Sequence, residues 1–119
     1  MSIWSVHAAS FYKEVAQTQI VWGIKDCSGF PAPKGTDGKR VMPFWSSESR
    51  ALAIIDSLPD YKGFAPVPIP WAEFVSRWVP GLEKEKLLVG VNWSGERATG
   101  YDITPSELME NVEIQKNGA

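Results

Sequence analysis

The chain has 119 residues, 44% of them hydrophobic and 12% aromatic, with a formal net charge of −2. This balance excludes a disordered chain, which would have few aromatic residues and a high net charge. It also argues against nucleic acid as a partner, because phosphate binding needs clustered Lys and Arg and the only basic pair is Lys39-Arg40. We predict one globular domain over residues 1–119, with a frayed tail at 115–119.

The cellular compartment of the protein is predicted from its cysteine content and its apolar segments. Cys27 is the single cysteine, so no internal disulfide can form, which is typical of a reducing compartment. The N-terminus lacks the basic segment and apolar run of a secretory signal. No apolar stretch approaches the roughly 20 residues that a membrane-spanning helix needs. We therefore expect a cytoplasmic protein that does not contact a membrane.

The first third of the chain predicts a helix followed by two strands. Five residues at i, i+3, i+4, i+7 and i+11 form one helix face: Trp4, His7, Ala8, Phe11 and Val15. Apolar runs with β-branched residues predict strands at residues 20–24 and 41–45, separated by a Gly- and Pro-rich loop. We expect these strands to pair as a hairpin with a long loop. Pro43 has no N–H to donate, so the second strand should lie at an edge.

Two further helices are predicted in the middle of the chain. Ser46 or Ser47 caps the first, and Pro59 stops it because the residue before proline avoids the helical region. A proline-rich stretch follows, in which residues 67–69 can form a short edge strand. The next helix has an apolar stripe at i, i+3, i+4 and i+7, which Trp78 completes as a core residue: Trp71, Phe74, Val75 and Trp78. Pro80-Gly81 is predicted to end it.

The last third predicts a β-hairpin and a helix. Apolar residues alternate from Leu87 to Trp93, and residues 98–103 return as a paired strand after a turn. Thr104 and Glu107 form a capping box that begins a short helix. The predicted order is α-β-β-α-(β)-α-β-β-α. It indicates an α+β fold with a mainly antiparallel sheet of four to five strands in consecutive pairs and helices packed on one face.

Several strings in the chain resemble a family of small bacterial proteins known as a domain of unknown function, number twenty-seven-fifty in that series. The resemblance runs from about Phe11 to Leu108 and is carried by Val21-Trp22, Pro43-Phe44-Trp45-Ser46-Ser47, Arg50-Ala51, Gly63-Phe64, Trp78-x-Pro80-Gly81-Leu82, Leu88-Val89-Gly90-Val91-Asn92-Trp93-Ser94-Gly95 and Gly100-Tyr101-Asp102. It implies no established activity, so no catalytic residue is carried over. A strand that ends in an aromatic residue before Ser and a helix also looks like the N-terminal part of SseB-like secretion-accessory proteins.

Known catalytic and metal-binding signatures do not fit the chain. Residues 35–40 lack the spacing of a phosphate loop, and residues 92–96 lack the glycines of a nucleophile elbow. One His and one Cys cannot supply a zinc site within a monomer, so we predict no metal and no cofactor. We interpret His7 as a partly buried histidine rather than a catalytic one, and Cys27 as an ordinary free thiol.

The six tryptophans are the unusual feature of the composition. Trp4, Trp71 and Trp78 lie on helical stripes and are predicted to be core residues. Trp22, Trp45 and Trp93 lie in or at the ends of strands, where they either close the core or form a binding surface. The sequence leaves both interpretations open.

The candidate site is the region where the second strand and the hairpin strand would end. If these ends meet, small polar residues, a helix N-terminus and basic side chains form a concave patch with aromatic walls and a positive floor. The candidate residues are Trp45, Ser46, Ser47, Arg50, Trp93, Ser94, Arg97, Tyr101 and Asp102, with Asp26 and Glu48 as further polar neighbours.

Two functions are compatible with these residues. The first is a non-enzymatic module that binds another protein or regulates it, including the immunity-type case in which the partner is a toxin. The second is a small enzyme or binding protein that acts on a small anionic ligand through Arg50, Arg97, Tyr101 and Asp102. The absence of a recognisable catalytic set favours the first.

Overall fold

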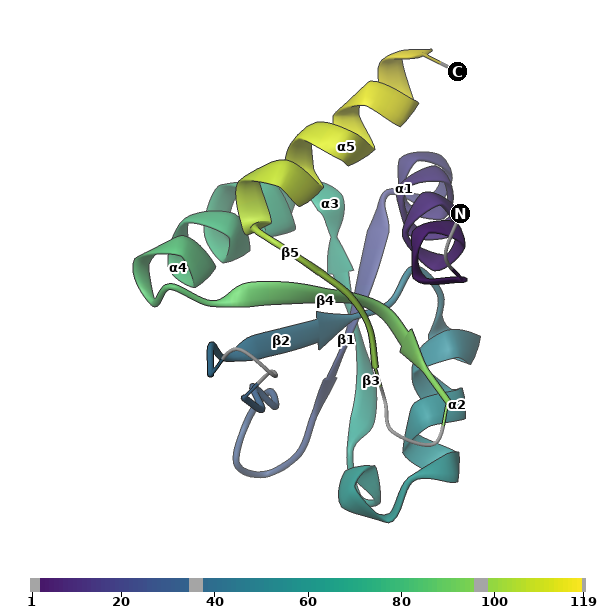
Figure 1. Cartoon of the computed structure of the whole chain (residues 1–119), viewed down its shortest axis with the longest axis vertical. Helices are drawn as coiled ribbons and strands as arrows, with labels where there is room; N and C mark the ends of the chain where they lie inside the picture. The colour runs from purple at the N-terminus through teal and green to yellow at the C-terminus, as the bar shows by residue number, and fades with distance from the viewer. Residues whose placement is uncertain (1–2, 35–37, 96–98, 119) are drawn as a thin grey trace.

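The computed structural model describes residues 3–34, 38–95 and 99–118, and these form an α+β fold in the predicted order of elements (Figure 1). The elements are α1 (Ile3–Thr18), β1 (Ile20–Lys25), β2 (Val41–Phe44), α2 (Glu48–Ser57), a 3₁₀ turn (Pro59–Tyr61), β3 (Ala65–Pro70), α3 (Trp71–Glu73), a π-helical turn (Phe74–Trp78), α4 (Val79–Lys84), β4 (Leu88–Ser94), β5 (Thr99–Ile103) and α5 (Pro105–Gly118).

The strands form two small sheets that are mostly antiparallel. β1 pairs with β3 in one, and the order β2-β4-β5 makes the other, in which β2 and β4 run parallel. The predicted hairpin of β1 with β2 is therefore wrong. β2 pairs along its whole length with β4, an edge position that tolerates Pro43. The backbone link to β1 is made just beyond β2, where Trp45 forms two backbone hydrogen bonds of 2.8 and 2.7 Å with Trp22.

Alternating prolines do not prevent β3 from pairing. Pro66, Pro68 and Pro70 stand opposite Ile24, Trp22 and Ile20 of β1. An antiparallel strand turns the N–H groups of alternate residues toward its partner. The hydrogen bonds between β1 and β3 can form because the prolines occupy the positions of β3 whose N–H would point away from β1.

The strands lie between two separate groups of buried side chains. The first core cluster comes from α1, α3 to α4, α5 and one side of the strands: Ala8, Phe11, Val15, Val21, Phe44, Ile69, Trp71, Phe74, Val79, Leu82, Val89, Val91, Ile103, Leu108 and Val112. The second core cluster comes from α2 and the other side of the strands: Ile24, Val41, Trp45, Ala51, Ile54 and Trp93. Helices thus cover both faces, not one as predicted. The physical reason is β4, whose residues 89–93 are all buried and so need cover on both sides.

The third predicted helix continues through Pro80-Gly81 and ends at Lys84. The expected end at Pro80 is wrong because a π-helical turn precedes it, in which the N–H of Val79 bonds to the carbonyl of Phe74. Pro80 then follows directly after this turn, where the hydrogen-bond pattern has already departed from the α-helical one. The π turn also rotates the buried face. Val79 is buried, whereas Trp78 is half-buried and packs against the first core cluster.

The other helix ends largely follow their sequence signals. Ser47 caps α2 by accepting a hydrogen bond from the N–H of Arg50, and the chain leaves the helix before Pro59. Thr104 and Glu107 bond to each other at the start of α5, which continues past residue 115 to Gly118. Among the described helices, none combines the length and apolar character needed to cross a bilayer.

Candidate functional site

Trp45 and Trp93 meet between α2 and β4. The indole Nε1 of Trp45 donates to the backbone oxygen of Trp93 over 2.8 Å, and Nε1 of Trp93 donates to Oδ1 of Asp102 over 2.9 Å. Trp45 is fully buried and Trp93 is 8% exposed. Gly90 and Gly100 make room for the Trp93 ring, since a Cβ would lie 2.4 Å from it at Gly90 and 2.9 Å at Gly100.

Asn92 holds the end of β4 against the start of α2. Its backbone has φ 48°, a left-handed conformation within the irregular pairing of β4 and β5 between Val91 and Ser94. Its buried side chain accepts a 2.9 Å hydrogen bond from the N–H of Ser46 and donates over 3.2 Å to the carbonyl of His7. One amide therefore joins β4, α2 and α1.

An ion pair between α1 and α2 extends this network. Glu14 accepts hydrogen bonds from Nε and Nη2 of Arg50 over 3.2 and 2.9 Å, and from Oγ of Ser46 over 2.6 Å. The hydrogen bonds from Arg50 lower the pKa of Glu14 below its usual value, and the Ser46 hydroxyl acts in the same direction. The carboxylate therefore stays ionised at neutral pH and neutralises the charge of Arg50.

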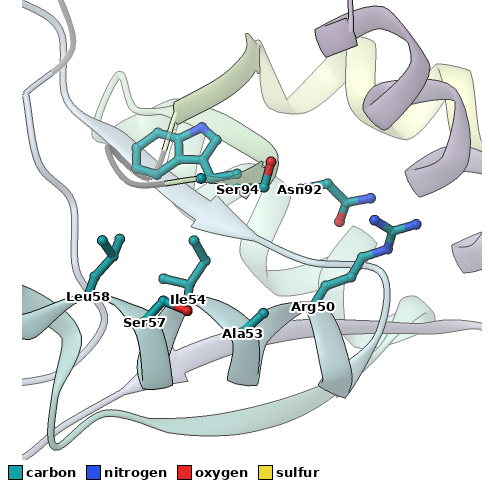
Figure 2. Close-up of a pocket in the computed structure, with 9 residues that line it drawn as sticks. Arg50, Ala53, Ile54, Ser57, Leu58, Asn92 and Ser94 are labelled. Carbon is teal, nitrogen blue, oxygen red and sulfur yellow. The ribbon is translucent and has the colours of Figure 1, made fainter.

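A cavity of about 370 Å³ lies between α2 and β4, and we call it the α2–β4 cavity (Figure 2). Its walls combine apolar and polar side chains: Arg50, Ala53, Ile54, Ser57, Leu58, Asn92, Trp93, Ser94 and Gly95. Ala53, Ser57 and Gly95 are exposed, so the cavity opens to solvent. Figure 2 shows the α2 side chains rising toward Asn92 and Ser94, with Arg50 at one end and Leu58 at the other. The site thus has an apolar body and a polar end.

The predicted site residues divide into three groups. Arg50, Trp93 and Ser94 line the cavity. Trp45 and Ser46 are buried, and Ser47 is occupied as the cap of α2.

Four further candidates in the described part of the chain lie away from the cavity walls. Tyr101 is exposed on β5, and Asp102 holds the Trp93 ring. Glu48 is exposed in the first turn of α2, and Asp26 closes a turn by accepting from the N–H of Ser28. Arg97 lies outside the described residues.

Sequence reasoning missed Asn92, Glu14 and every lining residue of α2 except Arg50. The signal for Asn92 was an amide within an otherwise apolar strand, which must find partners if the strand is buried. Glu14 had no such signal. It lies 32 and 36 residues from Ser46 and Arg50, and only the folded chain brings them together.

The described residues also show how the other polar candidates lie. Nδ1 of His7 is 3.4 Å from Oγ of Ser94, and Cys27 is exposed. Within residues 3–34, 38–95 and 99–118, no three His, Cys, Asp or Glu side chains gather as metal ligands would. The expectation of a chain without metal or cofactor stays a prediction.

These features define a small α+β domain with helices on both sides of two short sheets and an open cavity at one strand end. The chain belongs to the family described as "Protein of unknown function (DUF2750)", whose model matches residues 8–112. This confirms the resemblance carried by the tryptophan-containing strings.

One solved structure with a similar chain path is the Tic22 protein of Anabaena, described by the words "protein transport". The two chains are 17% identical, the match has a TM-score of 0.42, and it covers 68% of this chain but 45% of the Tic22 chain. The likeness found is to this protein and not to the SseB-like proteins, which the strand that ends in an aromatic residue before Ser and a helix had suggested. No curated protein matches the sequence.

Proposed function

We propose that this domain is a non-enzymatic protein-binding module whose α2–β4 cavity receives an apolar side chain of the partner. The observation that carries the proposal is the cavity itself. Its volume of about 370 Å³ lies at the small end of known ligand pockets, and Ala53, Ile54, Leu58 and Trp93 give it apolar walls. Such a space suits one or two side chains of a peptide better than a large cofactor.

The polar groups beside the cavity support binding rather than catalysis. Asn92 and Glu14 bond to the fold itself, so their hydrogen-bonding capacity holds α1, α2 and β4 together. No buried side-chain N or O of the described residues is left without a partner. A site of this kind offers shape and apolar surface to a ligand instead of a set of reactive groups.

The charge balance favours a peptide over a small anion. Glu14 neutralises Arg50, so the polar end of the cavity does not present a net positive charge. Nε and Nη2 of Arg50 bond to Glu14, which leaves Nη1 able to donate to a neutral acceptor. A backbone carbonyl of an extended peptide is an acceptor of this kind.

The test is selection of random linear peptides displayed on phage, with the full chain as bait. In the matched variant Ala53→Trp, an indole fills the mouth of the cavity from an exposed helix position. The control is Ala72→Trp, an exposed alanine of α3 that does not line the cavity.

We expect peptides that share an apolar residue, bind the wild type and Ala72→Trp equally, and lose at least tenfold in affinity for Ala53→Trp. Failure to enrich any peptide, or equal binding by Ala53→Trp, would overturn the proposed function.

A further inference from the structure

A second cavity adjoins the first around the C-terminal end of α2. Its volume is about 460 Å³, and it shares Ser57 and Leu58 with the α2–β4 cavity. Its other walls include Ile55, Asp56, Pro59 and Lys62. We call it the helix-end cavity. Since the same two residues border both spaces, the two cavities are neighbours on either side of Ser57 and Leu58.

The helix-end cavity lies where α2 presents hydrogen-bond acceptors. The N–H of Leu58 bonds to the carbonyl of Ile54, and those of Tyr61 and Lys62 bond to the carbonyls of Leu58 and Pro59. In the described part of the chain no backbone N–H bonds to the carbonyls of residues 55–57, and Pro59 has no N–H to offer them. The end of a helix that carries such carbonyls has a partial negative charge and attracts cations.

The ionised side chains around this cavity add to that preference. Asp56 lines it and is exposed, and Asp60 follows in the adjacent 3₁₀ turn. Lys62 is the opposing charge and also lines the cavity. Two carboxylates and a helix C-terminus outweigh one ammonium group, so the local balance is negative.

From the shared walls and this charge, we infer that the partner is an extended peptide segment with an apolar residue for the α2–β4 cavity and a Lys or Arg for the helix-end cavity. The inference rests on the proposed function and deepens it. On this inference the two cavities form a single groove around the end of α2, which binds one apolar and one basic side chain of the peptide.

The experiment measures the affinity of the selected peptides for the full chain by titration calorimetry. Asp56→Asn removes the attractive charge, and Lys62→Gln removes the repulsive one. Glu110→Gln, at an exposed position of α5, changes the net charge as Asp56→Asn does and is the control.

We expect Asp56→Asn to weaken binding of a Lys-containing peptide roughly two- to fivefold, as an exposed ion pair does, and Lys62→Gln to strengthen it by a similar factor. Glu110→Gln should change nothing. The charge-swapped pair, Asp56→Lys with a Lys→Glu peptide, should restore the lost affinity.

The outcomes separate the two proposals. One outcome would overturn the inference and leave the proposed function standing. In that outcome the peptides share an apolar residue and lose affinity for Ala53→Trp, but they contain no basic residue and their affinity does not change with Asp56→Asn or Lys62→Gln. Failure to obtain any cavity-dependent peptide would overturn both.

Discussion

The two core clusters of this domain are built by different means. In the first, Phe44, Phe74 and Trp71 fill the interior by ring contacts, with centroids 5.1 Å apart for the Phe44–Phe74 pair and 5.6 Å for Trp71–Phe74. In the second, Trp45 and Trp93 are anchored by hydrogen bonds from their indole N–H groups, and a buried amide lies beside them. The first cluster has one bond of this kind, from Nε1 of Trp71 to Oε1 of Glu113 over 2.9 Å, but its two Phe rings are held by packing. In the second cluster both buried tryptophans are hydrogen-bonded to the rest of the fold.

The difference teaches where a binding site can form in so small a domain. A cluster that depends on close packing leaves no space without losing stability. A cluster whose aromatic rings are fixed by hydrogen bonds can border an open cavity, because the rings keep their positions without a full set of neighbours. The α2–β4 cavity lies against the second cluster, beside Ile54 and Trp93.

The largest expected effect is in the first cluster. Phe74 is fully buried between Phe44 and Trp71, so Phe74→Ala should lower the free energy of unfolding by about 3 to 5 kcal/mol. Denaturant unfolding measures it. A loss of less than about 2 kcal/mol would show that the first cluster tolerates a cavity and would break the comparison.

Asn92→Ala tests the polar attachment of the second cluster. It leaves the buried N–H of Ser46 without its partner and places alanine at φ 48°, so we expect a loss of about 2 to 4 kcal/mol.

The matched control for this variant is Asn92→Gly, which removes the same hydrogen bonds but accepts the left-handed backbone. It should be about 1 kcal/mol less destabilising than Asn92→Ala. Equal stability of the two variants would show that the backbone conformation contributes nothing.

Trp78→Ala sharpens the comparison within one helix. The half-buried indole makes edge contacts with Phe30 and Phe44, at centroid distances of 4.7 and 5.7 Å. Because part of the ring faces solvent, we expect a loss of about 1 to 3 kcal/mol, less than for Phe74→Ala. Thermal or denaturant unfolding checks the order. A loss as large as that of Phe74→Ala would mean that Trp78 also fixes the segment containing Phe30.

The smallest effect is expected from the Glu14–Arg50 pair. Both side chains are about one-third exposed, at 34% and 36%, so solvent screens their interaction. A double-mutant cycle with Glu14→Gln and Arg50→Gln should give a coupling free energy of about 0.2 to 1 kcal/mol. A coupling of zero would show that the pair neutralises Arg50 without stabilising the fold.

The same pair gives a pH dependence of known sign. The pKa of Glu14 is lower in the folded chain, so the folded state favours the carboxylate. Its contribution is full above the unfolded pKa and is lost as the pH falls through the folded pKa. The stability difference between wild type and Glu14→Gln should therefore shrink as the pH falls from neutral through the acidic range in which carboxyl groups titrate. A difference that grows on acidification would contradict this assignment.

The local elements could be predicted because their signals lie within a few residues. The helix cap at Ser47, the stop at Pro59 and the box at Thr104 depend on neighbouring side chains and backbone groups. The continuation of the third helix could not be predicted in this way. Proline normally ends a helix, and the π turn that admits Pro80 depends on where Phe74 and Val79 must be buried.

Strand pairing and the site could not be predicted from local signals either, because both depend on contacts between segments far apart in the sequence. β1 shows no local preference for β3 over β2, and the choice rests on contacts between distant segments. The sequence suggested that Trp45 and Trp93 end neighbouring strands, and the structure brings them together. It left open whether both rings would be buried, as they are, and it gave no sign that Glu14 would bind Arg50.

The alternating prolines of β3 affect how copies of this protein can associate with one another. Exposed strand edges are templates on which chains stack into aggregates, because unpaired N–H and C=O groups can continue the sheet. On the outer side of β3, Pro66, Pro68 and Pro70 supply no N–H groups at all. A second strand that approaches this edge finds acceptors without donors and cannot form a ladder. The prolines therefore protect this edge against fibrous self-association through their covalent structure.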